Sequence, residues 1–272
     1  MITPLALDVT SLPTAFAADC PDALAIFARG TTEAPGNGIV GDAFVNTLRA
    51  QLAPKTLGIY SVDYPATTEF HTAVDGIRDA RNHIVAAAAA CPKTKMVLGG
   101  FSQGAAVAGF VTAGTIPDGV SADDVPAPMP PDISDHVSAV VLFGKPSQRF
   151  MRAINDPPVN VGPLYQIKTR ELCVDDDLVC DAHGTSFDAH NTYVETGMVN
   201  QGVAFAVGQL HAGWAADALS PTTETSTAPA PSTAAISPAA GSTGPAQHLP
   251  PAAPALPGPQ PLIPAAAPLP PN

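Results

Sequence analysis

A serine between two glycines is the first feature of this sequence that could carry out chemistry. It lies in Gly100-Phe-Ser-Gln-Gly104, a G-x-S-x-G motif that follows an apolar run from Lys95 and precedes small residues compatible with a helix. In that context the serine occupies a tight strand-to-helix turn, which lifts its hydroxyl above the sheet edge, and the helix N-terminus faces developing negative charge. The pattern predicts Ser102 as a nucleophile; the alternative is a glycine-rich turn with an inert serine.

A serine nucleophile needs a base that accepts its proton and a carboxylate that orients this base. In α/β-hydrolase-like sheets the three groups follow the order serine, acid, histidine along the chain. The candidate acids downstream of Ser102 include Asp132, Asp135, Asp156, Glu171, Asp175, Asp176, Asp177, Asp181 and Asp188. The candidate bases are His136, His183, His190 and His211. The motif alone does not choose among them.

Composition and charge restrict the class of function. The formal net charge is −12 at pH 7, and without any basic run the chain is not expected to bind nucleic acid. No stretch of about 18 or more apolar residues occurs, so we expect no transmembrane segment. No C-x-x-C pattern is present, which argues against a zinc site. We expect neither a metal nor a cofactor.

The chain divides into three parts. We expect residues 1–18 to be a signal peptide with an incomplete start, because Ala15-Phe-Ala17 matches a signal-peptidase site; a frayed N-terminus is the alternative. Residues 19–217 suit a single catalytic domain. Residues 218–272 hold roughly half of the 31 prolines, among Ala, Ser and Thr, and predict a disordered tail. This tail is either a tether or linker, or a passive extension.

Four cysteines allow three disulfide pairings: Cys20, Cys91, Cys173 and Cys180. Cys173 and Cys180 are close enough in sequence to close a short loop, which leaves Cys20 to pair with Cys91. Two disulfides would indicate an oxidising compartment. Four buried free thiols are the alternative.

Apolar strands and amphipathic helices are expected to alternate along the chain. The expected strands are Ala23–Ala28, Leu57–Tyr64, the strand before Ser102, His136–Phe143 and Leu164–Thr169. The expected helices are Ile39–Leu52, Thr72–Ala90, the helix after Ser102 and His190–Ala215, with a surface loop at Pro117–Ser134. This order predicts an α/β fold with a central, mostly parallel five-stranded sheet and helices on both faces.

Several segments together resemble the cutinase family, including the cutinase-like serine esterases of mycobacteria, across about residues 19–212. Phe27-Ala-Arg-Gly-Thr-Thr-Glu33 resembles the family's oxyanion loop, and Val62-Asp-Tyr-Pro-Ala66 resembles the end of its second strand. Gly100-Phe-Ser-Gln-Gly104 resembles its nucleophile elbow, and Val140-Val-Leu-Phe-Gly-Lys-Pro146 a family strand. Cys173-Val-Asp-Asp-Asp-Leu-Val-Cys180 resembles the acid loop, and the following Asp-Ala-His190 segment the base.

This resemblance implies the remaining site residues. The acid lies three residues before the second cysteine of the short loop, which is Asp177, and the base ten residues after that cysteine, which is His190. The implied first disulfide joins Cys20 to Cys91, eleven residues before the serine.

The implied oxyanion donors are the backbone N–H of Gln103 and the backbone and hydroxyl of Thr31. Thr31 stands where we expect serine, and its extra methyl group restricts χ1. Phe101 stands where the family often has tyrosine, a change that affects packing.

Four other polar residues near these segments are interpreted as non-catalytic. His183 is expected to be a solvated loop residue, and Asp175 and Asp176 to add local negative charge. Arg29 is expected to be structural, pairing with an acid near the site.

The resemblance thus implies a secreted or cell-envelope-associated serine esterase, acting as a monomer. Its expected substrates are short- to medium-chain acyl esters, polyesters or lipids, cleaved through a Ser-His-Asp triad and an acyl-enzyme. One alternative is an acetylxylan-type polysaccharide deacetylase, since such enzymes share this fold and triad. Another is an envelope binding protein with a vestigial site.

Overall fold

The computed structural model describes residues 20–219, so the predicted signal peptide and all of the predicted tail beyond residue 219 lie outside the described residues. The strands are β1 (Ala23–Ala28), β2 (Leu57–Ser61), β3 (Lys95–Phe101), β4 (Val137–Phe143) and β5 (Thr169–Leu172). The α-helices are α1 (Gly38–Leu52), α2 (Ala73–Ala90), α3 (Gln103–Val111), α4 (Gln148–Ala153), α5 (Pro163–Gln166), α6 (Phe187–His190) and α7 (Met198–Leu219). Two short 3₁₀ helices are Phe70–Thr72 and Pro131–His136.

The five strands form one parallel sheet in the order β2-β1-β3-β4-β5. β1, β3 and β4 are almost entirely buried, as near-continuous apolar strands are in a sheet covered on both faces. Because the strands are parallel, their carboxyl ends meet at one edge, where ligands bind in open α/β sheets. The predicted fold class is confirmed.

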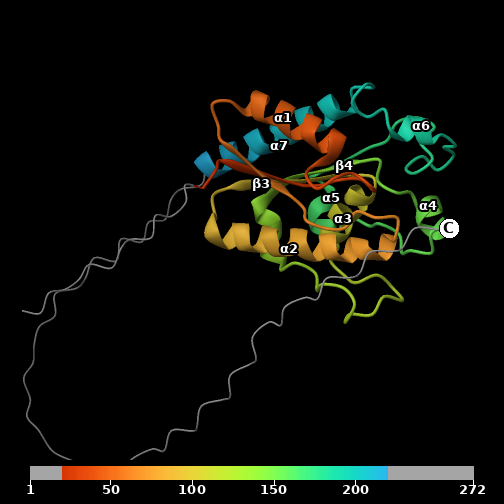
Figure 1. The fold of residues 1–272 in the computed structure, drawn as a ribbon. Helices are drawn as coiled ribbons and strands as arrows, with labels where there is room; N and C mark the ends of the chain where they lie inside the picture. The colour runs from red at the N-terminus through yellow and green to blue at the C-terminus, as the bar shows by residue number, and fades with distance from the viewer. Residues whose placement is uncertain (1–19, 220–272) are drawn as a thin grey trace, which may run out of the picture. The chain divides into compact units, whose positions relative to one another are not determined.

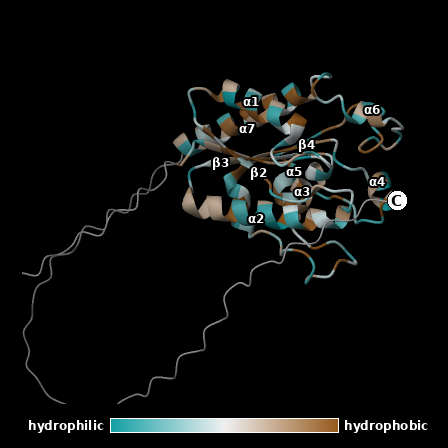
Figure 2. Ribbon diagram, viewed as in Figure 1, coloured by the Kyte–Doolittle hydropathy of each residue, from teal (hydrophilic) through white to brown (hydrophobic). Residues whose placement is uncertain are grey.

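Helices cover both faces of the sheet (Figure 1). Side chains alternate between the faces along a strand, so Phe27 packs with α1 and α7 while Ile26 packs with α2 and α3. Figure 2 shows hydrophobic and hydrophilic residues alternating around α1 and α2, as amphipathic helices require. None of the helices between residues 20 and 219 is long and apolar enough to cross a membrane.

The predicted last strand, Leu164–Thr169, is wrong. Its first half is helix α5, which begins at Pro163, a position where the missing N–H of proline breaks no hydrogen bond. Leu164 and Ile167 are 52% and 90% exposed, so these apolar side chains are outside the core. The strand is instead the polar segment that starts at Thr169 and pairs with β4 at the sheet edge.

Two other predicted elements differ from the observed bounds by more than one residue, and the predicted loop Pro117–Ser134 ends in the 3₁₀ helix Pro131–His136. β2 ends at Ser61 rather than Tyr64, although the Val62 N–H still donates to the Phe27 carbonyl. The predicted closing helix, His190–Ala215, is two helices, α6 and α7, with an irregular segment between them. Gly197, at φ 75°, ends that segment directly before α7.

Candidate active site

The nucleophile candidate lies at the sharp turn between β3 and α3. Ser102 has φ 55° and ψ −119°, a backbone conformation that is strained for a residue with a side chain. Neighbouring glycines make the turn possible. A Cβ on Gly104 would lie 2.0 Å from the Ala28 carbonyl oxygen, and one on Gly100 would lie 2.2 Å from the Gly104 oxygen. The strand and helix therefore approach closely enough to expose the serine hydroxyl.

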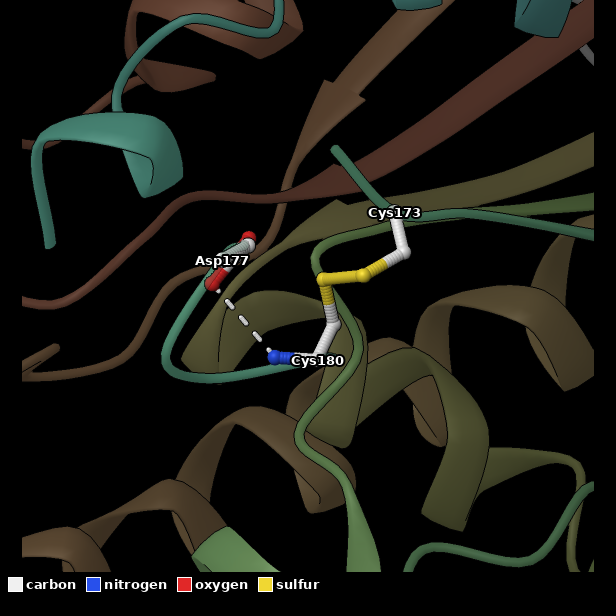
Figure 3. Close-up of side chains that lie close together, drawn as sticks. All are labelled: Cys173, Asp177 and Cys180. Carbon is white, nitrogen blue, oxygen red and sulfur yellow. Dashed lines mark hydrogen bonds between the residues drawn. A yellow bond between two sulfur atoms is a disulfide. The ribbon is translucent and has the colours of Figure 1, made fainter. Parts of the chain in front are cut away.

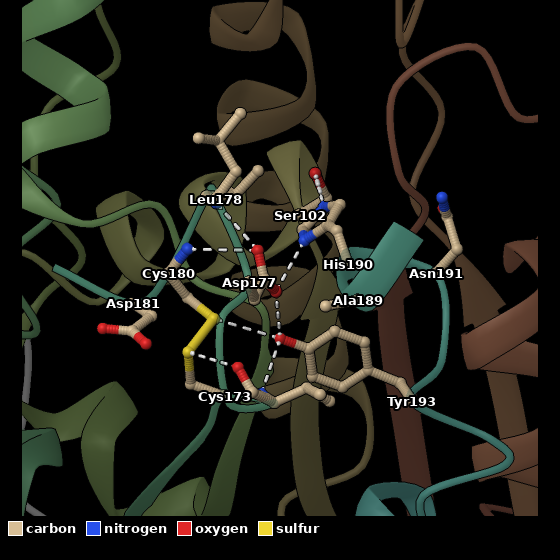
Figure 4. A network of polar contacts seen from close by, with 12 residues as sticks. Ser102, Cys173, Asp177, Leu178, Cys180, Asp181, Ala189, His190, Asn191 and Tyr193 are labelled. Atoms are coloured by element: carbon tan, nitrogen blue, oxygen red, sulfur yellow. Dashed lines mark hydrogen bonds and ion pairs between the residues drawn. A yellow bond between two sulfur atoms is a disulfide. The ribbon is translucent and has the colours of Figure 1, made fainter. Parts of the chain in front are cut away.

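Ser102, His190 and Asp177 form one chain of hydrogen bonds (Figure 4). The Nδ1 atom of His190 lies 2.7 Å from Asp177 Oδ2, and its Nε2 atom lies 2.8 Å from Ser102 Oγ. An ionised carboxylate only accepts hydrogen bonds, so Nδ1 carries the proton and Nε2 accepts from the serine hydroxyl. The structure thus brings together all three residues that the sequence singles out.

The carboxylate of Asp177 is fully buried and held by donors on both oxygens. Oδ1 accepts the Val179 N–H at 2.7 Å, while Oδ2 accepts the Tyr193 hydroxyl at 2.6 Å in addition to His190. Burial raises the pKa of Asp177, but the hydrogen bonds from His190 and Tyr193 outweigh it, so the net pKa lies below its ordinary value. Asp177 is therefore ionised at neutral pH.

Asp177 belongs to a loop closed by the Cys173–Cys180 disulfide (Figure 3). Arg149 braces the same loop, since its guanidinium donates to the carbonyls of Leu178 and Gly184. Cys173, Asp177 and Cys180 have potential metal ligands within 4.8 Å of one another. The two sulfurs are bonded to each other, however, and offer no thiolate to a metal. The Cys173–Cys180 disulfide therefore restrains the loop that carries Asp177.

The short helix α6 presents His190. Ser186 caps this helix by accepting the Ala189 N–H at 3.0 Å. Phe101 stacks on the imidazole with ring centroids 4.9 Å apart, and only 6% of His190 is exposed. Phe101, at the position where the resembled family often has tyrosine, therefore packs directly on the candidate base His190.

The loop that carries Thr31 is held by the Glu33 side chain and by the backbone of the segment at Ala66. The Glu33 carboxylate accepts the N–H groups of Gly30 at 2.6 Å and Ile39 at 2.7 Å. The Thr32 N–H donates to the Ala66 carbonyl at 2.6 Å, and both Thr32 and Ala66 have positive φ. These bonds place Thr31 on the wall of the cavity that Ser102 also lines.

Gln103 opens α3, so its backbone N–H has no partner within the helix. Its side chain is 4% exposed and donates from Nε2 to the Thr67 carbonyl at 3.0 Å. This bond ties the start of α3 to the loop that also holds Thr32. Gln103 and Thr31 both border the cavity. The segment Ala66–Thr67 holds both of their segments in place, because it binds Thr32 and the Gln103 side chain.

Arg29 is structural, but its predicted pairing with an acid is wrong. Its guanidinium is 3% exposed and donates to the backbone carbonyls of Glu33, Val62 and Tyr64. The Tyr64 hydroxyl in turn donates to the Arg29 carbonyl. A buried guanidinium with several carbonyl acceptors satisfies its donors without an ion pair. Arg29 joins β1 to the segment after β2 and thereby supports the Thr31 loop.

The other predicted candidates lie elsewhere. His183 is exposed, and Asp176 is engaged in its own loop, where its carboxylate accepts the Thr185 N–H at 2.8 Å. Of the remaining candidate acids and bases, only Asp156 lines the cavity that contains Ser102, and its pKa is raised by burial. Among these candidate acids and bases, Asp177 and His190 are the two that hydrogen bonds connect to Ser102.

Tyr193 is the residue that sequence reasoning missed. It is fully buried, its hydroxyl donates to Asp177, and its pKa is raised by burial and by that carboxylate. Its ring packs against Phe101 with centroids 5.4 Å apart. The available signal was weak: an aromatic residue three positions after the candidate base.

The sheet and the strand-turn-helix serine define an α/β-hydrolase-like serine hydrolase. A match to the cutinase family covers residues 19–210, and the chain belongs to that family of serine esterases. It is 54% identical over 167 residues to "Probable carboxylesterase Culp5" of Mycobacterium tuberculosis, covering 61% of this chain and 95% of the relative. It is 44% identical over 196 residues to "Phospholipase Culp4" of the same organism, covering 71% and 80%.

Solved structures agree with the fold. A Trichoderma reesei cutinase in complex with a phosphonate inhibitor is similar with a TM-score of 0.53 and 29% identity, over 70% of this chain and 77% of that one. The catalytic core domain of acetyl xylan esterase from Trichoderma reesei has a TM-score of 0.58 and 23% identity, over 70% and 100%. At that identity the second likeness concerns the fold alone.

Proposed function

We propose that this protein hydrolyses carboxylic esters by two-step acyl transfer, with Ser102 as nucleophile, His190 as general base and Asp177 as the orienting acid. The observation that carries the proposal is the unbroken hydrogen-bond chain from Ser102 through His190 to Asp177. Two further observations support the proposal. The chain belongs to a family of esterases, and Ser102 has the strained backbone that is typical of a nucleophile elbow.

In the first step His190 Nε2 accepts the Ser102 proton while Oγ attacks the ester carbonyl. The ionised Asp177 stabilises the imidazolium that forms. His190 then returns the proton to the alcohol that leaves, which yields the acyl-enzyme. A water molecule repeats the attack, with His190 again as base, and releases the acid and the free serine.

The oxyanion of the tetrahedral intermediate needs donors fixed before the reaction begins. The backbone N–H of Gln103 has no partner within α3, and Thr31 contributes its backbone N–H and hydroxyl from the opposite wall. The Glu33 and Ala66 hydrogen bonds hold the Thr31 loop rigid. Loss of one oxyanion donor lowers turnover on the order of a hundredfold.

We also propose that the protein acts as a monomer outside the cytoplasm, secreted or associated with the cell envelope. Two disulfides, Cys20–Cys91 and Cys173–Cys180, support this location, because disulfides persist in oxidising compartments. Cell fractionation followed by size-exclusion chromatography checks both statements. Reduced protein confined to the cytoplasm, or a stable dimer, would contradict them.

The test of catalysis is the initial rate on p-nitrophenyl esters of increasing acyl length. Ser102→Ala removes the nucleophile and is expected to lower kcat by about 10⁴-fold or more. Ser138→Ala is the matched control, since Ser138 lies on β4 outside the cavity, and its rates are expected to equal the wild type.

Each outcome of this assay discriminates between functions. Hydrolysis that disappears with Ser102→Ala supports the esterase. Hydrolysis confined to the acetate ester would instead favour a deacetylase. Equal and negligible rates in the wild type and in Ser102→Ala would leave a hydrolase fold used for binding.

A further inference from the structure

The cavity at Ser102 extends well beyond the groups that the reaction needs. Its volume is about 810 Å³, toward the upper end of the range for small-molecule sites. From Ser102 and His190 it continues between α2 and the segment 113–128, and most of the residues along this extension are apolar.

One wall of the extension is a single face of α2. Val74, Ile77 and Arg81 line it at spacings of three and four residues, which place side chains on one side of a helix. At 1.5 Å of rise per residue, this face runs about 10 Å from Val74 to Arg81. The wall is thus long enough for a chain rather than for an acetyl group.

The opposite wall is the segment 113–128. It contributes Ile116, Pro117, Val120, Val125 and Pro126, all partly exposed apolar side chains that border the cavity. Arg81 fixes this wall in place, because its Nε atom donates to the Ala127 carbonyl at 2.6 Å. The Arg81 guanidinium therefore links α2 to the segment 113–128 at the border of the cavity.

A third side is apolar as well. Phe110 and Val111 of α3, with Phe150, Met151 and Ile154 at α4, border the same cavity. Polar residues such as Thr115 and Asp124 also border the cavity, but the apolar side chains predominate, and an alkyl chain needs no hydrogen-bond partner from them. The lining therefore matches an acyl chain and disfavours a polysaccharide.

We propose that this extension is the binding groove for a long acyl chain, and that Ile77 and Val120 determine acyl-chain specificity. The inference rests on the proposed esterase function and names its substrate class: esters of fatty acids of about 12 to 16 carbons. A sixteen-carbon chain needs roughly 500 Å³, since a methylene is about as large as a water molecule at about 30 Å³. The remaining volume accommodates the ester group at Ser102.

The experiment measures kcat/KM for p-nitrophenyl esters from butyrate to hexadecanoate, each below its aggregation concentration. For the wild type, kcat/KM is expected to rise with chain length, by up to about fourfold per buried methylene. Ile77→Trp fills the groove, so the hexadecanoate-to-butyrate ratio of kcat/KM is expected to fall at least tenfold. Ile167→Trp is the matched control: Ile167 is 90% exposed and outside the cavity, and its ratio is expected to equal the wild type.

Val120→Asp is a second variant, on the surface segment, that does not disturb the sheet. Asp124 also lines the cavity, but it is exposed, whereas Val120 is half-buried. A carboxylate at position 120 is therefore expected to lower the same ratio at least tenfold, because burying a charge beside an alkyl chain is unfavourable.

The possible outcomes distinguish a failure of the acyl-chain groove from a failure of the proposed esterase function. Butyrate hydrolysis that depends on Ser102, with no rise toward longer chains and unchanged ratios in both groove variants, would overturn the groove and leave the esterase. No hydrolysis of any ester would overturn both.

Discussion

At the scale of single residues, the site depends on how its carboxylate is held. His190 is not the only group that holds Asp177: the Val179 N–H donates to one carboxylate oxygen, and the Tyr193 hydroxyl shares the other with His190. Hydrogen bonds to a charged group are worth more than those between neutral groups. We therefore propose that Tyr193 is a positioning residue that acts through Asp177.

Tyr193→Phe removes that hydrogen bond and keeps the ring. We expect kcat to fall about tenfold, since a hydrogen bond to a charged group contributes about 1.5–3 kcal/mol, while KM stays within twofold. Tyr60→Phe is the control, because its hydroxyl donates at 2.9 Å to Asp79 outside the cavity. Steady-state kinetics of both variants, with Tm measured in parallel, make the comparison. A loss of Tm in Tyr193→Phe without a fall in kcat would reduce its role to packing.

At the scale of elements, the two disulfides have different tasks. Cys20–Cys91 spans 71 residues and joins the segment before β1 to the end of α2, while Cys173–Cys180 spans only 7 and surrounds the acid. The entropy of loop closure favours the longer link, at about 4 against about 2 kcal/mol. The first disulfide is thus mainly a matter of stability and the second of geometry.

Replacing each pair by serine separates these tasks. Cys20→Ser with Cys91→Ser is expected to lower Tm more and to leave kcat of the remaining folded protein near the wild type. Cys173→Ser with Cys180→Ser is expected to lower Tm less and kcat more, because Asp177 loses its closed loop. Thermal melts and kinetics at 25 °C give both quantities. The reverse ranking of kcat would contradict the assignment.

The sequence predicted best those features that depend on the residues of a single segment. Runs of buried apolar residues predicted β1, β3 and β4, and glycine spacing predicted the turn at Ser102. β5 escaped prediction because its residues Thr169-Arg-Glu171 are polar and lie at the sheet edge, whereas the apolar Ile167 beside it is exposed.

Long-range contacts were harder to predict. The order of the motif left many acids and several histidines open, and only the family resemblance selected Asp177 and His190. The partners of Arg29 are backbone carbonyls from separate segments. Because every residue has a backbone carbonyl, the sequence does not indicate which carbonyls Arg29 binds. The Tyr193 contact likewise depends on how two loops meet.

At the scale of the whole molecule, stability is expected to depend on depressed carboxylate pKa values. Hydrogen bonds from Lys55 and Thr56 lower the pKa of Asp22 to about 2, and Asp177 also lies below its ordinary value. Each carboxylate binds protons less readily in the folded state. Their contribution to stability is therefore present above about pH 4 and is lost as the pH falls toward the folded pKa.

Asp22→Asn tests this dependence. We expect the variant to lower Tm by a few degrees at pH 7, because a neutral amide binds Lys55 more weakly. The difference from the wild type should shrink at about pH 2.5, where Asp22 itself becomes partly protonated. Asp118→Asn, at an exposed position, is expected to change Tm at neither pH. A difference that is constant with pH would assign Asp22 a role in packing.

The wide separation of the site residues along the chain determines when activity can arise during translation. Ser102 and His190 are 88 residues apart, and α7, which packs with α1 on one face of the sheet, follows both. A growing polypeptide thus contains the proposed nucleophile long before the proposed base, and the face of the sheet that α1 covers in part lacks its second helix until α7 emerges. Under the proposed mechanism, every nascent chain and every fragment cut before residue 190 is inert toward esters. The order of residues alone delays activity until the fold is complete.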